Sequence, residues 1–372
     1  MHNTLSSDAK CFNGTQITTI STVNKTMEVR QHRLKNYWDV IYDPQINLSH
    51  FAEIDLNDVN RNIGHRYRLV DFSKLNDSNS ISCKLDKHNF RECDFFGESK
   101  GNKINFSNCK FEKIYFGYGL YKNVKFQKCD FIKCSFNMAK FIDCQFIDCR
   151  FDDISFSGNE TIFQNTLINS KRIVSAAFLN VDEDVLKQYA TTVDYQKKRF
   201  ENTKAKFAKN LLVSVSSTTD DDLYYNAVKT YLISRSKAKI EKFQYGAKDA
   251  DKGRIRKISY QVRAITSITE LLILRVSGLI NDWGNSILRA LIIGVAMIFI
   301  FAIGYYFLMD TSVVGAIIKS IDITLLAGYT KHVTKLTPVH QQIVMLFNMI
   351  LGLWWYAIMI PTLINRICVS RQ

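Results

Sequence analysis

Residues 129–156 read CDFIKCSFNMAKFIDCQFIDCRFDDISF and repeat with a period of five. An aromatic residue stands at every fifth position from 106 to 156 without a break. These positions are Phe106, Phe111, Phe116, Tyr121, Phe126, Phe131, Phe136, Phe141, Phe146, Phe151 and Phe156. A small or apolar residue, most often cysteine, stands two positions before each of them, and the other three positions are mostly polar or charged. A period of five matches neither an α-helix nor a flat β-strand.

Such a period fits a chain that turns a corner every five residues. Four sides close a square coil, and successive coils stack at about 4.8 Å, the spacing between strands. The aromatic residue would fill the middle of the coil, and the small residue would occupy the tighter inner place beside it. A shorter run, Leu85, Phe90 and Phe95, comes before and is out of register by one residue. Weaker repeats at 54–56 and 70–72 indicate that the coil begins further upstream.

The repeat resembles the pentapeptide-repeat family over roughly residues 83–168. The family more often has Leu at the centre and Ala two positions before it, and Phe and Cys are bulkier variants that it also uses. The resemblance implies a right-handed quadrilateral β-helix over 83–170, after an N-terminal region, 1–82, with early or irregular repeats. Some members mimic duplex DNA, which requires a dense acidic surface. Residues 81–170 contain 13 Lys or Arg and 11 Asp or Glu, so we expect a surface that binds some other ligand or protein.

Cysteine is concentrated in the repeat region. Seven of the nine cysteines lie there: Cys83, Cys93, Cys109, Cys129, Cys134, Cys144 and Cys149. A metal ladder or a redox sensor is one interpretation, but the paired spacing of a metal site is missing. The other interpretation is that cysteine is a small residue that fits the narrow inner position. We favour the second, and we expect reduced thiols and no metal or other cofactor.

Residues 171–287 are predicted to form a basic, helical, cytoplasmic connector. Between positions 171 and 289 there are 22 Lys or Arg against 13 Asp or Glu. Apolar residues recur at helical spacing from Leu223 to Leu232, which indicates an amphipathic helix. Residues 211–222 are interpreted as a loop and a helix start. Residues 258–280 are predicted to form an apolar helix lying along the bilayer surface.

Two segments qualify as transmembrane helices in a two-helix module over 288–372. Residues 290–309 and 343–364 contain 20 and 22 residues without a charge, and a bilayer core of about 30 Å needs about 20 helical residues. Basic residues precede the first segment and follow the second, which favours cytoplasmic N- and C-termini. The first 30 residues show no signal-peptide pattern. We therefore expect a multi-pass protein of the bacterial inner (plasma) membrane. A basic patch could also bind nucleic acid, but no nucleic-acid motif is recognisable, so no nucleic acid is expected as a partner.

The segment between the two spans, residues 316–330, reads AIIKSIDITLLAGYT and is too short to cross a bilayer. Together with the spans, it resembles the two-transmembrane pore-loop channel family, in which a re-entrant helix and a filter lie between two spans. Residues 284–289 and 351–353 also resemble segments of bacterial channels that carry pentapeptide repeats. The resemblance implies a homotetramer. The filter-like positions are Thr324, Leu325, Leu326, Ala327, Gly328, Tyr329 and Thr330.

The filter-like segment departs from the pattern of a potassium channel. Leu325 and Leu326 replace a Thr pair, and Thr330 replaces the second filter glycine. Lys331 replaces the following Asp, so copies around an axis would create a positive field that repels cations. We further hypothesise that Asp322 pairs with Lys331 and braces the loop, because a carboxylate in a membrane segment is usually paired.

These patterns leave three functional hypotheses open. The first is an oligomeric, weakly selective pore, gated when the repeat domain senses or binds a partner. The second is a membrane-anchored interaction scaffold, and the third is a bacterial membrane-permeabilising defence effector. A simple two-helix anchor with a folded outer loop is the alternative to the pore loop. No catalytic triad, phosphate loop or metal cluster is recognisable, so an enzyme is not expected. The partners expected are the lipid bilayer, further copies of the chain, a permeant ion of unknown identity and an unknown ligand on the repeat surface.

Overall fold

The computed structural model describes residues 52–53, 62–71, 82–96 and 103–369, apart from 118, 178, 180–191, 217–219, 249–252, 310 and 335–336. The chain divides into two compact units, residues 1–268 and 269–372. Each unit is described by itself.

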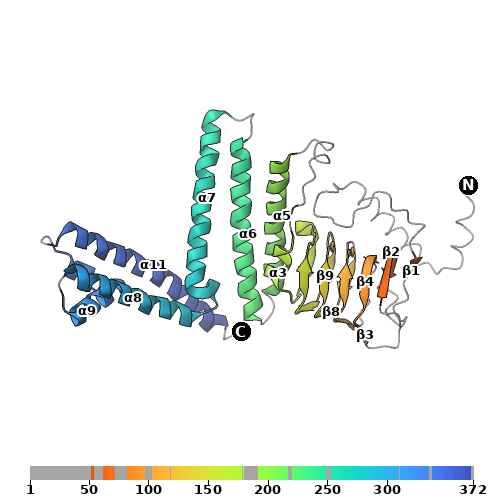
Figure 1. Ribbon diagram of the computed structural model, residues 1–372, viewed down its shortest axis with the longest axis horizontal. Coiled ribbons are helices and arrows are strands. Elements are labelled where there is room, and N and C mark those ends of the chain that lie inside the picture. Colours follow the sequence, from red (N-terminus) through yellow and green to blue (C-terminus); the bar gives the residue numbers. More distant parts are fainter. Residues whose placement is uncertain are drawn as a thin grey trace, which may run out of the picture. The chain divides into compact units, whose positions relative to one another are not determined.

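The first unit contains a parallel β-solenoid (Figure 1). One sheet consists of β1 (Ala52–Glu53), β2 (Asn62–Asp71), β4 (Asn89–Phe96), β6 (Lys110–Glu112), β9 (Asp130–Ile132) and β12 (Arg150–Asp152). A second consists of β3 (Ser82–Asp86), β5 (Lys103–Ser107), β8 (Val124–Gln127) and β11 (Gln145–Ile147). A third consists of β7 (Leu120–Lys122), β10 (Lys140–Ile142) and β13 (Ile162–Gln164). The parallel bridges Tyr115–Ser135 and Ser135–Ser155 form the fourth face. The predicted four-sided coil is therefore confirmed, while its handedness stays a prediction.

Pairing along the solenoid explains the break in register. Phe111 pairs with Phe131, and Phe106 pairs with Phe126, each one coil of four pentapeptides apart. Phe90 pairs instead with Phe111, so this coil is one residue longer. Upstream, β2 pairs in parallel with β4, which confirms that the coil begins before residue 83. The weak repeat at 54–56 and Phe72 of the second weak repeat lie outside the described residues.

The interior of the coil is a set of stacked aromatic columns. The rings of Phe111 and Phe131 lie 4.9 Å apart with 8° between their planes, and those of Tyr121 and Phe141 lie 4.7 Å apart. These separations match the distance between hydrogen-bonded strands, about 4.7–4.9 Å. Rings of neighbouring columns meet edge-on, as Phe126 does with Phe131 at 71°. The centre positions therefore form one continuous apolar core.

The described cysteines occupy the small inner position that the sequence predicted. Five are free and buried: Cys109, Cys129, Cys134, Cys144 and Cys149. Each Sγ lies close to a backbone carbonyl of the preceding coil, for example 3.3 Å from Cys134 Sγ to the oxygen of Phe111. Burial raises the pKa of the Cys134 thiol and that of the Cys144 thiol to about 12. Both thiols are therefore protonated and poorly nucleophilic at neutral pH.

Each corner of the coil requires an unusual backbone conformation. At the described non-glycine corner positions, which stand two residues after a centre residue, φ is positive, between 47° and 60°. These corner residues are Lys87, Asn108, Lys113, Asn123, Lys128, Lys133, Met138, Asp143, Asp148, Asp153 and Asn165. Asn and Asp tolerate this region better than other residues do, because their short side chains bond locally. Their frequency at this place in the repeat is thus a consequence of the corner.

Helices cover the C-terminal end of the solenoid. After η4 (Gly158–Glu160) and α3 (Ser170–Ser175) come α5 (Val193–Val215) and α6 (Asp221–Lys248). The ring of Phe207 on α5 stacks on Phe156 at 4.0 Å. Ser214 Oγ accepts a hydrogen bond from the backbone N–H of Thr166 at 3.0 Å, which satisfies a group that has no further coil to pair with. α5 extends through Val215, so the predicted loop at 211–222 is shorter than expected. Its apolar residues are helical because they pack on the coil.

The second unit is helical, and α7 (Arg254–Asn281) lies across the division between the units. After it come η5 (Asp282–Gly284), α8 (Ile287–Met309), α9 (Val313–Thr324), α10 (Tyr329–His332) and α11 (Val339–Val369). Among the described residues, α7, α8 and α11 are each long and apolar enough to cross a membrane.

The sequence predicted two spans and a surface helix, and α7, the predicted surface helix, is also long and apolar enough to be a third span. The basic residues of α7 gather at its start, and beyond Arg263 it carries only Glu270 and Arg275 as charged residues. Its last two-thirds are therefore as apolar as a span requires. Three crossings would place the two ends of the chain on opposite sides, so the cytoplasmic location of both termini depends on α7 staying at the surface.

The corner geometry predicts that Lys128→Gly stabilises the solenoid. Glycine adopts positive φ freely, and we expect the free energy of unfolding to rise by up to about 1 kcal/mol. The control is Lys125→Gly in β8, where glycine should lower it by about 0.5–1 kcal/mol. Thermal unfolding of the detergent-solubilised chain measures both. A loss of stability in both variants would contradict the corner conformation.

Burial of the cysteines predicts that they resist alkylation. In native protein at pH 8, Cys134 and Cys144 should stay unmodified by iodoacetamide, because thiols with pKa values of about 12 remain protonated there. Both should react fully in guanidinium. Peptide mass spectrometry reads each site, and rapid native labelling of either would count against a closed coil.

Candidate functional site

The helix α9 is too short to cross a bilayer. Its 12 residues span about 18 Å at 1.5 Å per residue, against a hydrocarbon core of about 30 Å. It begins at Ser312, whose Oγ accepts a hydrogen bond from the backbone N–H of Gly315 at 3.2 Å. The short helix expected between the two spans is therefore present.

One face of α9 is buried against α8 and α11. Ala316, Ser320 and Ile323 lie on this face at helical spacing, and all three are fully or almost fully buried. Ser320 Oγ donates a hydrogen bond to the backbone carbonyl of Ile298 on α8 at 2.7 Å. The opposite face, with Ile318 and Ile321, is exposed. α8 and α11 together form a helical hairpin, and α9 is docked onto this hairpin along one side.

A buried chain of polar side chains joins the three helices. Thr324 Oγ1 at the end of α9 donates to Asn348 Oδ1 of α11 at 2.9 Å. Asn348 Nδ2 then donates to the hydroxyl of Tyr305 on α8 at 2.8 Å. All three residues are fully buried. Of these three residues the sequence pattern pointed to Thr324 alone, although an asparagine within an uncharged 22-residue segment was a signal for Asn348.

Two glycines allow the helices to approach closely. A Cβ at Gly352 of α11 would lie 2.4 Å from the backbone oxygen of Thr324. A Cβ at Gly294 of α8 would lie 2.3 Å from the ring of Trp355. That ring reaches α8 and donates its Nε1–H to the carbonyl of Ala290 at 2.8 Å. Small residues at contacts between membrane helices commonly have this role.

The filter-like residues form a tight turn. Leu326 has a φ of 61°, and the N–H groups of Ala327 and Gly328 donate to the Asp322 carbonyl at 2.8 and 3.1 Å. The Leu325 and Leu326 side chains are 39% and 42% exposed. The turn therefore brings two apolar side chains to the surface at the end of α9.

The backbone after the turn differs from that of a potassium filter. Tyr329 and Thr330 begin the short helix α10. A potassium filter coordinates its ion with rings of backbone carbonyls from an extended segment. The described backbone from 325 to 332 has turns and one helical turn instead. Ion coordination of the potassium-channel type has no support in this geometry.

The partner of Asp322 differs from the one predicted. Its Oδ2 lies 3.0 Å from His332 Nε2, and both side chains are mostly buried. Lys331 is exposed instead. His332, one residue after Lys331 in α10, points back toward α9. It takes the place predicted for Lys331 as the partner of Asp322. Gly328 lies beneath this contact, since a Cβ there would be 3.0 Å from Asp322 Cβ.

Comparisons with known proteins support the repeat region. A model described as pentapeptide repeats matches residues 122–158 in eight copies. No curated protein and no solved structure matches the chain. The matched residues cover part of the solenoid and none of α8, α9 or α11.

The close contact at Gly352 predicts a selective loss of stability. Gly352→Ala forces α9 away from α11, because the added methyl meets backbone, and we expect a cost of about 1–3 kcal/mol. Gly304→Ala on α8 is the matched control, since nothing lies within 4 Å of a Cβ there. Thermal unfolding in detergent, monitored by tryptophan fluorescence, compares the stability of the two variants. Equal melting temperatures would disprove the contact.

The brace predicts different effects for two neighbouring residues. His332→Ala removes the partner of a mostly buried carboxylate and should cost about 1 kcal/mol. Lys331→Ala changes an exposed side chain and should stay within about 0.5 kcal/mol of the unmodified chain. The same unfolding assay applies. A larger loss of stability in Lys331→Ala than in His332→Ala would instead favour Lys331 as the partner of Asp322.

Proposed function

We propose that this chain is an oligomeric membrane protein that conducts ions weakly selectively and is gated through its pentapeptide-repeat coil. The observation that carries the proposal is α9, a helix too short to span, anchored by polar side chains between two span-length helices. Non-helical backbone at membrane depth is tolerated where protein or water covers it. A docked short helix followed by a tight turn fits a re-entrant segment.

Several copies of the chain are needed for a pore of this kind. α8 and α11 have many exposed apolar residues, including Phe299, Phe307 and Phe347, that suit lipid or a neighbouring copy. The exposed turn at 325–327 would face the axis when copies meet around it. The resemblance to pore-loop channels favours four copies.

Weak selectivity follows from the chemistry of the turn. Leu325 and Leu326 offer no hydroxyl oxygens for a dehydrated cation, and the turn lacks an extended row of carbonyls. Lys331 is exposed beside it, and in a tetramer four ammonium groups would surround the mouth. We therefore expect anions to pass at least as well as cations.

Ion flux through liposomes tests the proposal. The purified full chain is reconstituted, and currents are recorded in KCl and NaCl gradients. We expect unitary currents, a reversal potential that does not separate K⁺ from Na⁺, and loss of current in Gly352→Ala but not in Gly304→Ala. A stably folded, reconstituted oligomer that passes no ion under any gradient, or currents that Gly352→Ala leaves unchanged, would refute the pore.

A membrane-anchored scaffold is the second candidate. The observation in its favour is the solenoid, a rigid body whose surface carries nearly balanced charge and whose C-terminal end is already covered by α5. A scaffold would be a folded membrane protein without flux that retains a specific protein partner on the coil.

A further inference from the structure

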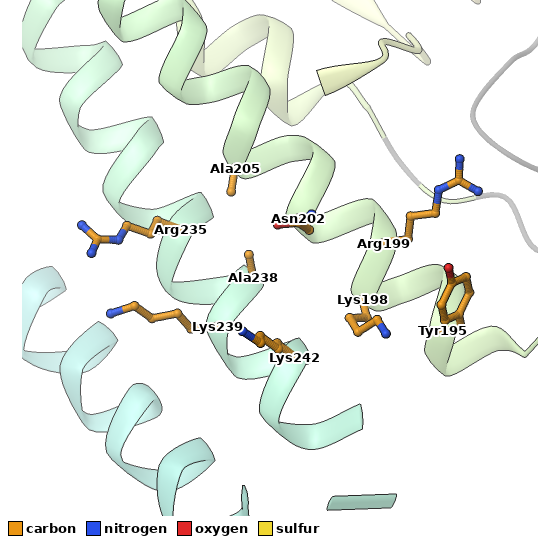
Figure 2. Close-up of a pocket in the computed structure, with 9 residues that line it drawn as sticks. All are labelled: Tyr195, Lys198, Arg199, Asn202, Ala205, Arg235, Ala238, Lys239 and Lys242. Atoms are coloured by element: carbon orange, nitrogen blue, oxygen red, sulfur yellow. The ribbon is translucent and has the colours of Figure 1, made fainter. Parts of the chain in front are cut away.

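A cavity of about 570 Å³ lies between α5 and α6 of the first unit. Its basic side chains are Lys198 and Arg199 from α5 and Arg235, Lys239 and Lys242 from α6. Figure 2 shows Lys198 and Lys242 beside the space between the two helices, while the charged ends of Arg199, Arg235 and Lys239 point away from that space. Among the described residues that line it, none is acidic.

Small side chains make room for this cavity. Ala205 of α5 and Ala238 of α6 line the cavity from its two sides, and Asn202 of α5 adds an amide beside Ala205 (Figure 2). Lys198, Asn202 and Ala205 follow one another at spacings of four and three on α5, so they share one face of that helix. The two helices therefore leave room between them at this place.

Two acidic residues of α5, Asp194 and Glu201, lie outside the cavity lining. Asp194 forms an ion pair with Lys248 at 2.9 Å. Glu201 is attracted by Lys204 and Lys237, while its burial raises the pKa of the carboxyl. Neither acidic residue lines the cavity. The described residues that line the cavity therefore contribute basic and neutral side chains and no carboxylate.

Two tyrosine rings hold the amino group of Lys198 in place. Its Nζ lies 3.9 Å from the ring centre of Tyr245 and 4.6 Å from that of Tyr195. Cation–π contacts orient an ammonium group and leave its N–H groups able to donate to an anion.

We propose that this cavity binds a ligand that carries two or more phosphate groups. Lysine and arginine are the usual partners of phosphate oxygens, as point charges and as forked donors. Ligand sites typically measure about 300–1,000 Å³, so this cavity has room for more than a single phosphate. The ligand can come from a soluble phosphate ester or from a phosphorylated lipid headgroup. This site is independent of whether the hairpin conducts.

Binding to the full chain in detergent micelles tests the site. Isothermal titration uses inorganic pyrophosphate, ATP and the soluble headgroup inositol 1,4,5-trisphosphate. We expect at least one of the three to bind, and Lys198→Gln/Lys242→Gln to weaken it at least tenfold. The matched control is Lys197→Gln/Lys209→Gln, which removes two exposed charges of α5 outside the cavity and should change affinity less than twofold.

A second variant keeps every charge. Ala238→Phe fills the cavity and should weaken binding at least tenfold. Circular dichroism and the melting temperature check that each variant is folded. Preference for pyrophosphate or ATP assigns a soluble source. Preference for the inositol phosphate, with thermal stabilisation in nanodiscs containing phosphatidylinositol 4,5-bisphosphate over phosphatidylserine, assigns a lipid. No binding of any probe, or equal losses in the cavity and control variants, would overturn the proposal.

Discussion

Stacking of aromatic rings inside the coil is the interaction on which the first unit depends. The strands of neighbouring coils are fixed at their hydrogen-bonding distance, and the ring separations of the columns, such as 4.7 Å between Phe126 and Phe146, are the same distance. Ring stacking and backbone pairing therefore reinforce each other. The place beside most rings holds a small or branched apolar side chain, most often cysteine and otherwise alanine, valine or isoleucine. The positive φ at each corner is the conformational cost of closing so small a coil.

An open end of such a coil would leave a row of unpaired backbone groups. α5 closes it with the ring of Phe207 continuing an aromatic column and with Ser214 pairing the backbone of Thr166. The cap uses one side of α5. The face turned to α6 remains available, and it carries the basic cavity. One helix thus joins the rigid repeat domain to a site whose charge suits an anionic ligand.

The hairpin of α8 and α11 depends on a different interaction. Lipid would offer no hydrophobic force between these helices, so their association would rely on close packing and on buried hydrogen bonds. Gly352 and Gly294 allow the backbones and the Trp355 ring to meet, and Thr324, Asn348 and Tyr305 connect three helices. These contacts, and not the length of α9, determine where this short helix lies against α8 and α11. Its turn ends in exposed leucines rather than in oxygen ligands, which is the physical basis for expecting poor selectivity.

The sequence by itself determined the solenoid, the inner position of the described cysteines and the span-length helices α8 and α11, because periodicity and hydropathy are local properties of the chain. It also located α9. The tertiary structure decided what local patterns do not encode. Residues 211–215 became helix because they pack on the last coil. Asp322 met His332 rather than Lys331 because the chain after Gly328 winds into a helical turn. The basic cavity likewise exists only because two consecutive helices, α5 and α6, pack side by side and place Ala205 and Ala238 along the same space.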